Sequence, residues 1–192
     1  MDDQQLVEAA RRGNDRAFAV LVRAHERALF CTAYSILRSS WDASDAVQDA
    51  FLEAYAKIED LRDSAKFKPW LSRILVNACY DTLGRRRRLV PVGEEPEAPD
   101  ATDAWPGAPS DGSTQAHAFI GTEAQMDLFR AVRGLDEDLR TAIALRYFLD
   151  LKVDDIAAAI DVPPGTVKSR INRALTRLAQ SLGRSTSLEV TQ

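Results

Sequence analysis

Residues 162–175 read VPPGTVKSRINRAL, and the chain continues TRLAQSL. The Pro-Pro-Gly step breaks one helical segment, and the helix that we predict after it carries Lys168, Arg170, Arg173 and Arg177. The chain of 192 residues is nevertheless acidic, with a net charge of -4 and an isoelectric point near 5.3. Because the bulk charge is not that of a nucleic-acid binder, the cationic helix needs a local explanation.

The acidic charge is concentrated in one segment. Residues 91–122 carry six Asp and Glu residues and no Lys or Arg, whereas residues 1–90 have a net charge of +2 and residues 123–192 are neutral. The same segment holds five prolines and four glycines. Such a composition buries too little apolar surface to offset the entropy lost on ordering. We therefore expect a flexible acidic linker at 89–122 between domains at 1–88 and 123–184, followed by a short tail at 185–192.

Both domains have the apolar spacing of helices. In the N-terminal domain, apolar residues predict one helix over about 18–37, a second over about 46–58, and a third from about Pro69. Asp42 or Ser44 can cap the second helix. In the C-terminal domain, two stripes are predicted: Leu128, Val132 and Leu135, then Leu139, Ala142 and Ile143. Strand alternation with turn residues is not evident, so the predicted fold is all-α, with two small helical domains.

Residues 151–180 have the form helix, break, helix. At 100° per residue, the second helix places an apolar stripe on one side, made of Val167, Ile171, Leu175 and Leu178. The opposite side holds Ser169, Asn172, Arg173 and Thr176, flanked by Lys168, Arg170 and Arg177. Arg and Asn can pair with base edges, and hydroxyls and cations suit phosphates. The pattern favours a DNA-binding helix-turn-helix. The alternative is a solvated face on a structural hairpin.

The predicted second helix of the N-terminal domain has an acidic outward face. Asp45, Gln48, Asp49, Leu52 and Glu53 lie opposite its apolar stripe. Acids around an exposed Leu suit a protein partner that offers cations around an apolar spot. A plain solvated face is the alternative.

The predicted third helix combines aromatic, cationic and amide side chains. Trp70, Arg73, Asn77 and Tyr80 share the face opposite its apolar residues, which include Ile74. Stacking with hydrogen bonding to base edges is how single-stranded bases are held. The loop at 62–68, with Arg62 and Lys66, could wall a pocket for a flipped base. The alternative is a face that docks on another part of the protein. An arginine run at 85–88 follows, and we expect it to contact phosphates.

Several other classes of protein are disfavoured. Two cysteines and two histidines, without a Cys-x-x-Cys pattern, predict neither disulfides nor a zinc site. We find no nucleotide-binding loop and no spacing of a catalytic triad, so we expect no enzymatic activity, no cofactor and no small-molecule substrate. Neither a signal peptide nor an apolar run of the roughly 18 residues needed to span a membrane is evident. We therefore expect a cytoplasmic protein without membrane insertion.

Five motifs in order resemble those of one family: RRGNDRAF, DAVQDAFLEAY, FKPWLSRILVNACYDTLGRRRR, LDEDLRTAIALRYFLDL and DIAAAIDVPPGTVKSRINRAL. They resemble the extracytoplasmic function group of the sigma-70 family of bacterial sigma factors, over about residues 4–88 and 123–183. The resemblance implies a factor that binds core RNA polymerase and directs transcription from particular promoters.

The resemblance also implies roles for residues of the N-terminal domain. Asp45, Gln48 and Asp49 match the helix that docks on the clamp helices of the β′ subunit, and Leu52 and Glu53 share their face. The set implied in recognition and melting of the −10 element is Arg62, Lys66, Trp70, Arg73, Ile74, Asn77 and Tyr80. Within it, Asn77 matches a residue that contacts a flipped base.

The C-terminal domain corresponds by resemblance to the module that reads the −35 element and meets the β flap. The implied contact set is Thr166, Lys168, Ser169, Arg170, Asn172, Arg173 and Arg177. The linker would thread toward the polymerase active site and RNA exit path, and an anti-sigma factor would restrain the protein. Lys152 stands where relatives often have a Ser that caps the first helix of the helix-turn-helix. A rival interpretation is a conventional helix-turn-helix regulator with a sensing domain, which acts on duplex operators without replacing a sigma factor.

Overall fold

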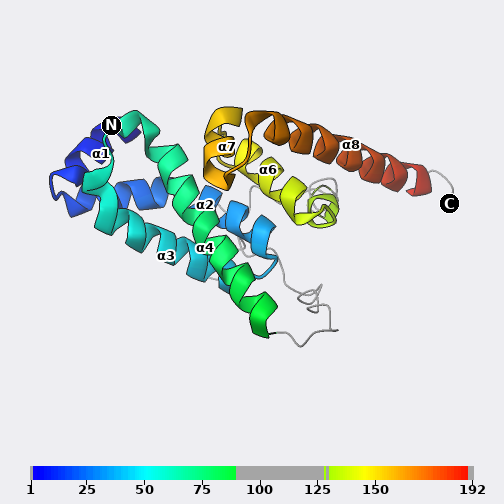
Figure 1. Ribbon diagram of the computed structural model, residues 1–192, viewed down its shortest axis with the longest axis horizontal. Coiled ribbons are helices and arrows are strands. Elements are labelled where there is room, and N and C mark those ends of the chain that lie inside the picture. The colour runs from blue at the N-terminus through cyan, green and yellow to red at the C-terminus, as the bar shows by residue number, and fades with distance from the viewer. Residues whose placement is uncertain (1, 90–127, 129, 190–192) are drawn as a thin grey trace.

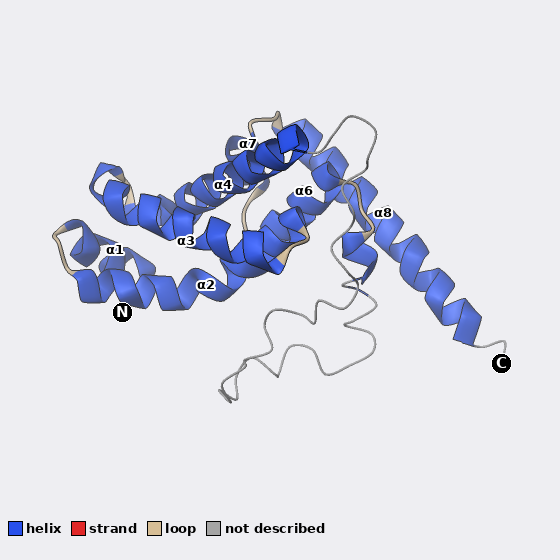
Figure 2. Cartoon of the chain, turned by 90° about the horizontal axis from the view of Figure 1, so that it is seen from below, coloured by secondary structure: helices blue, strands red, loops and turns tan. Residues whose placement is uncertain are grey.

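The computed structural model describes residues 2–89, 128 and 130–189 (Figure 1). The predicted linker lies outside them, apart from Leu89. Figure 2 shows helices and loops in the described part, without a strand, which confirms the all-α class. The N-terminal helices are α1 (Asp3–Arg11), α2 (Asp15–Leu37), α3 (Ser40–Lys57) and α4 (Phe67–Leu89), with 3-10 turns η1 (Ile58–Asp60) and η2 (Ser64–Lys66) before α4. The C-terminal helices are α6 (Glu137–Tyr147), α7 (Val153–Ile160) and α8 (Pro164–Glu189). Helix α8 therefore continues past residue 184, where the predicted domain ends.

Two helix starts differ from expectation because of local hydrogen bonds. Helix α1 was not anticipated: Oδ1 of Asp2 accepts a hydrogen bond from the Gln5 amide at 2.9 Å, and Gly13, at φ +82°, turns the chain into α2. Helix α3 begins at Ser40, several residues before the predicted caps. The side chain of Ser39, rather than Asp42 or Ser44, is the cap, and it accepts from the Asp42 amide at 3.3 Å.

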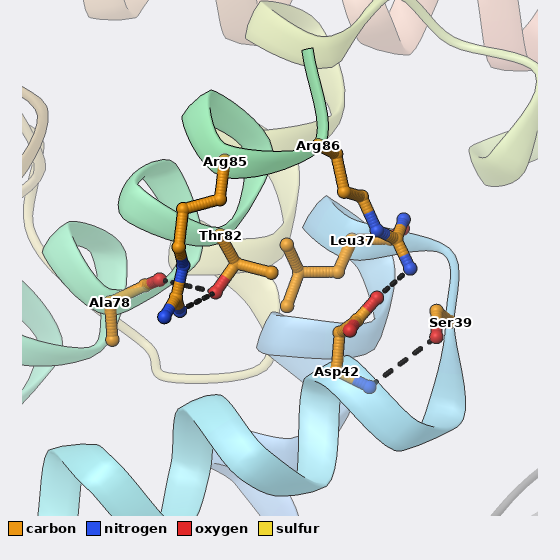
Figure 3. A network of polar contacts seen from close by, with 7 residues as sticks. All are labelled: Leu37, Ser39, Asp42, Ala78, Thr82, Arg85 and Arg86. Atoms are coloured by element: carbon orange, nitrogen blue, oxygen red, sulfur yellow. Dashed lines mark hydrogen bonds and ion pairs between the residues drawn. The ribbon is translucent and has the colours of Figure 1, made fainter. Parts of the chain in front are cut away.

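Arg86, near the C-terminal end of α4, contacts the end of α2 and the start of α3 (Figure 3). Arg86 donates from Nη1 to the Leu37 carbonyl at 3.2 Å and pairs with the Asp42 carboxylate. Arg85 donates from Nη2 to Oγ1 of Thr82 at 3.0 Å. Arg86 thus has a structural role that the arginine run did not suggest, since a cation at the last carbonyls of a helix stabilises it.

The helix-turn-helix is formed as the sequence predicts. Helix α7 has Lys152 at its start, without a side-chain cap, and it ends at Asp161 in the left-handed conformation, at φ 52°. The Pro163 carbonyl then accepts from the amides of Thr166 and Val167 at 2.9 and 3.2 Å, which starts α8.

A small core joins α8 to α6 and the segment before α6. It consists of Val132, Leu135, Leu139, Ile143, Ala174 and Leu178. Two residues that were predicted to belong to apolar stripes are exposed. Leu175 is 41% exposed, and its neighbour Ala174 is buried in the core instead. Leu128 is 45% exposed. The wheel angle of Leu175 placed it at the edge of the stripe, where burial depends on the neighbouring helix rather than on period alone.

The two domains pack against each other. Helix α6 contacts α2, and α7 contacts α4. Residues of α7 and its flanks, including Leu151, Ile156 and Ile160, belong to the same buried apolar cluster as the N-terminal core. In Figures 1 and 2, α8 runs away from this junction toward the C-terminus. The sequence predicted two domains but not their mutual packing.

A buried histidine ties α1 to α2 and α4. His25 is 7% exposed, its Nε2 lies 2.9 Å from Oδ2 of Asp3, and its ring centroid lies 5.6 Å from that of Phe67. Burial lowers the pKa of His25 below its ordinary value of 6.5, assisted by Lys68 and opposed by Asp3.

This burial predicts a pH-dependent stability. Below pH 6.5 the unfolded chain binds a proton at His25 that the folded chain does not bind until a lower pH. The contribution of His25 to the free energy of unfolding should therefore be fully present above pH 6.5. Below that pH it should decrease as the pH is lowered, by at most about 1.4 kcal/mol per pH unit. We expect His25→Gln to flatten the slope of the free energy of unfolding against pH, measured by urea titrations between about pH 7.5 and about pH 5.5. Equal slopes in the parent and in His25→Gln would contradict this assignment.

Candidate nucleic-acid and protein interfaces

The acidic face of α3 is exposed as predicted. All five of its candidate residues are open to solvent, with Leu52 at 61% exposure. Glu53 is engaged within the helix, because its Oε1 accepts from Nζ of Lys57 at 2.7 Å. Asp45 and Asp49 have no ion-pair partner among the described residues. Their charges are therefore available to a partner.

A groove of about 750 Å³ lies beside this face, between α2 and α3. Gln48 and Leu52 contribute to its α3 side. Its apolar lining consists of Phe18, Val22, Phe30, Val47, Phe51, Leu52 and Tyr55. Arg23, Glu26 and Arg27 add charged groups from α2. The α3 face is thus one wall of an apolar groove with charged borders, which suits a helical partner better than a flat solvated surface would.

The sequence interpretation missed the α2 wall of this groove. Val22, on the predicted helix over about 18–37, is only partly buried and lines the groove. Phe30 lies next to Leu29 and outside the spacing of the core residues. This apolar residue off the core face was the signal in the sequence for an apolar surface on α2. Tyr55 is 51% exposed, packs edge-on against Phe18 at 5.1 Å, and donates to Oδ1 of Asp15 at 2.7 Å. These contacts join α3 to the N-terminal part of α2 beside the groove.

The candidate face of α4 is only partly open. Arg73 and Asn77 are exposed, whereas Trp70 and Tyr80 are half-buried. The ring of Trp70 lies 6.1 Å from that of Phe67. Ile74 is 7% exposed and belongs to the core, the position that its spacing predicted. The part of Ile74 in DNA contact stays a prediction.

Both ends of this α4 face meet the C-terminal domain. Lys66, in the loop before α4, lies with its Nζ 3.4 Å from Oδ1 of Asp155 on α7. Toward the other end of this face, burial raises the pKa of the half-buried Tyr80, and Thr141 on α6 opposes the shift. Arg62 remains exposed. The alternative interpretation, in which the α4 face docks on another part of the protein, therefore agrees with the contact between Lys66 and the C-terminal domain.

The outward face of α8 is open. Lys168, Ser169, Asn172 and Arg173 are exposed, and Thr166 is half-buried in the first turn. Arg170 and Arg177 differ from them. Nη2 of Arg170 lies 2.7 Å from Oδ2 of Asp138, and Nη1 of Arg177 lies 2.5 Å from Oδ2 of Asp136. These two guanidinium groups are already paired within the domain.

Neither a metal centre nor a reactive thiol emerges from the described residues. No group of three or more His, Cys, Asp and Glu side chains among them is placed to hold a metal ion. Burial raises the pKa of Cys31 to about 11 and that of Cys79 to about 12. Within the same residues, the helices are too short or too polar to cross a membrane.

Comparison with known families matches both halves of the chain. Residues 21–89 match the model of Sigma-70 region 2, and residues 125–178 match the model of Sigma-70, region 4. The first match contains α3 and α4, and the second contains the helix-turn-helix. The two regions occur in the order that the motifs predicted.

Relatives extend this similarity over nearly the whole chain. The RNA polymerase sigma-H factor of Pseudomonas aeruginosa is 35% identical over 182 residues, which are 94% of this chain and 93% of the relative. The ECF RNA polymerase sigma-E factor of Escherichia coli is 34% identical over 174 residues, 91% of each chain.

Solved structures agree. The structure of CnrH in complex with the cytosolic domain of CnrY has a TM-score of 0.62 at 25% identity and covers 99% of both chains. The sigma factor RpoE in complex with the anti-sigma factor NepR from Bartonella quintana has a TM-score of 0.66 at 27% identity, over 86% of this chain and 96% of that chain. The chain therefore belongs to the sigma-70 family and, within it, to the extracytoplasmic function group.

Proposed function

We propose that this protein is an alternative sigma factor that binds core RNA polymerase and directs initiation at particular promoters. The observation that carries the proposal is the presence, in one chain, of matches to regions 2 and 4, each with an exposed candidate face. The protein supplies recognition and melting, and the polymerase supplies catalysis. Its site of action is the cytoplasm, where the polymerase works.

The α3 face and the adjoining groove are proposed to dock on the β′ clamp helices. Asp45 and Asp49 offer unpaired carboxylates, and Leu52 offers an apolar anchor at the groove. Charges of this kind steer association, and the buried apolar contact slows dissociation. Gln48 and Glu53 complete the predicted surface.

The α4 face is proposed to capture the melted −10 element within a module formed by residues 1–88. Asn77 can donate and accept at one base edge, and Trp70 can stack on a neighbouring base. Arg73 lies on the same face and can neutralise phosphate. Bases become available only after unpairing, so this face acts on a strand that is already leaving the duplex.

The outward face of α8, within a module of residues 123–184, is proposed to read the −35 duplex in the major groove. Arg173 and Asn172 have the chemistry for base edges, and Lys168 and Ser169 suit phosphates. Arg170 and Arg177, paired with Asp138 and Asp136, are better placed to orient the helix before contact. The linker is proposed to thread through the polymerase between the two modules.

Regulation by an anti-sigma factor is part of the proposal. Two related structures contain such a complex or the cytosolic domain of a bound partner, by their own descriptions. A partner that covers the α3 groove or the α8 face would compete with polymerase or promoter.

In-vitro transcription with sigma-free core polymerase tests the function. We expect specific start sites that depend on this protein. A conventional regulator would instead bind duplex operators without core polymerase and yield no transcript with core polymerase alone. That outcome would overturn the proposal.

We predict that Asn77→Ala reduces open-complex yield at the preferred promoter, because an unpaired base edge loses its partner. The loss should be on the order of tenfold or less and should flatten preference at one −10 position. Binding to core polymerase should be unchanged. Asp81→Ala, at another exposed position on the same helix, is the matched control. If Asn77→Ala lowers yield by one common factor across promoters varied only at −10, Asn77 has a structural role.

A further inference from the structure

An exposed tryptophan lies in the first turn of α3. Trp41 is 82% exposed, the largest fraction for any large apolar side chain in the described part of the chain. Within that part, neither an aromatic ring nor a cation packs on its indole ring. Tryptophan is enriched at protein interfaces and among the residues that contribute most to binding. The exposure of Trp41 is therefore better explained by binding to another molecule than by packing within the fold.

The fold fixes the direction of this side chain. Ser39 caps α3 by accepting from the Asp42 amide at 3.3 Å, and the Asp42 carboxylate pairs with Arg86 of α4 (Figure 3). At about 100° per residue, Trp41 lies opposite the side of α3 that packs on the N-terminal core. That buried side consists of Ala43, Ala46, Val47, Ala50 and Ala54. Trp41 thus cannot turn inward unless the first turn of α3 is lost.

Trp41 continues the acidic face of α3 toward its N-terminus. Asp45, Gln48 and Leu52 follow it at four, seven and eleven residues, so that all four side chains lie within about 60° of one another. Trp41 and Leu52 are the two ends of this line, about 16 Å apart along the helix axis. Leu52 is 61% exposed, and Asp45 between them has no ion-pair partner among the described residues. The face therefore has two apolar ends and an acidic middle.

The groove between α2 and α3 leads toward Trp41. One end of the groove is formed by Phe18 and Tyr55, whose rings are in contact. The other end, nearest the connection between the two helices, is formed by Phe30 and Ser44. Trp41 does not line the groove, but it precedes Ser44 by three residues, which is about one turn of α3. A helix that fills the groove and continues by one turn would meet the indole ring.

We propose that Trp41 is a second apolar anchor for the polymerase clamp helices that the α3 face is proposed to bind. The occupant that fits is a helix with two apolar side chains about three turns apart and basic side chains between them. It would place one apolar side chain beside Leu52 and the other on Trp41, and its cations beside Asp45 and Asp49. The inference rests on the proposed function, because it adds a contact to the same docking surface.

Competition against a labelled sigma factor for core RNA polymerase tests the anchor. Trp41→Ala should weaken binding by on the order of 30-fold, the loss expected when an interface tryptophan is truncated. Trp41→Phe should retain most of the affinity, because it keeps an aromatic ring. Val20→Ala, which truncates an exposed apolar side chain of α2 outside the groove lining, should bind like the parent. Because Trp41 is exposed, helicity and thermal midpoint should be the same in all four proteins.

Photo-crosslinking of the holoenzyme identifies the occupant. We expect p-benzoylphenylalanine in place of Trp41, in the full chain bound to core polymerase, to crosslink to the β′ subunit. The same group in place of Val20 should not crosslink to it. A crosslink from position 41 only to a second copy of this chain, or only to another polymerase subunit, would overturn the proposed occupant.

Asp49→Arg, measured in the same competition, separates this inference from the proposed function. If Asp49→Arg loses binding while Trp41→Ala binds like Val20→Ala, α3 remains the docking surface and Trp41 is not an anchor. If Asp49→Arg and Trp41→Ala both bind like the parent, the docking surface lies elsewhere, and the anchor is overturned together with it.

Discussion

Asp49→Arg should abolish competition for core RNA polymerase at concentrations where the parent competes fully. The parent carboxylate is exposed on α3, without an ion-pair partner in the described part of the chain, and lies beside the groove lined by Gln48 and Leu52. Reversing its charge opposes the cations expected on the partner and should cost on the order of 2–5 kcal/mol of binding free energy. Competition against a labelled sigma factor for core polymerase measures the change.

Asp60→Arg is the matched control for this prediction. Asp60 is an exposed acid in η1, outside the predicted face, so the substitution makes the same change in net charge. Circular dichroism should show unaltered helicity in both variants. If Asp49→Arg competes as well as Asp60→Arg, the docking surface lies elsewhere on the molecule.

The periodicity of the sequence was sufficient to predict which faces of single helices are buried and which are exposed. Val167, Ser169 and Arg173 lie buried or exposed on α8 as their wheel angles predict, and the face of α3 is open as expected. These outcomes follow because the inner and outer sides of such a helix are set by its own period. The missing side-chain cap of α7 was also visible in the sequence, in Lys152.

Helix α6 shows where this reasoning fails. Seven consecutive residues, 139–145, are buried, and they include Arg140 and Thr141. One side of α6 packs in the small C-terminal core, and the helix also contacts α2. A helix buried all round has no single stripe, and the stripe of Leu139 and Ile143 described only one of its neighbours. The available signal was the run of four consecutive apolar residues at 142–145.

The remaining misses are contacts between residues distant in the chain. Arg86 pairs with Asp42, and the α2 wall of the groove is completed by α3. No local pattern specifies which helices become neighbours, so a basic run was interpreted through its charge alone. The half-burial of Trp70 and Tyr80 has the same origin, since their face was predicted from α4 without its neighbours.

Packing within the C-terminal domain also separates the cations of α8 into two groups. Arg170 is paired with Asp138, and its side chain is 15% exposed, whereas Arg173 is exposed with no ion-pair partner among the described residues. Arg173 can therefore contact a base without first breaking an ion pair to another described residue. A contact by Arg177 would have to displace Asp136.

Arg173→Ala should accordingly cost the holoenzyme about 1–3 kcal/mol at its preferred −35 element and reduce its preference at one base position. Lys168→Ala and Arg177→Ala, if these residues contact phosphate, should weaken all promoters alike and lower the salt slope by roughly one each. The measurement is holoenzyme binding to promoters varied only at −35, repeated over a range of salt concentrations. Because Arg177 is already paired with Asp136, its substitution should give the smaller loss of the two arginines. A change in base preference from Arg177→Ala, with none from Arg173→Ala, would exchange the two assignments and place the C-terminal half of α8 closer to the bases.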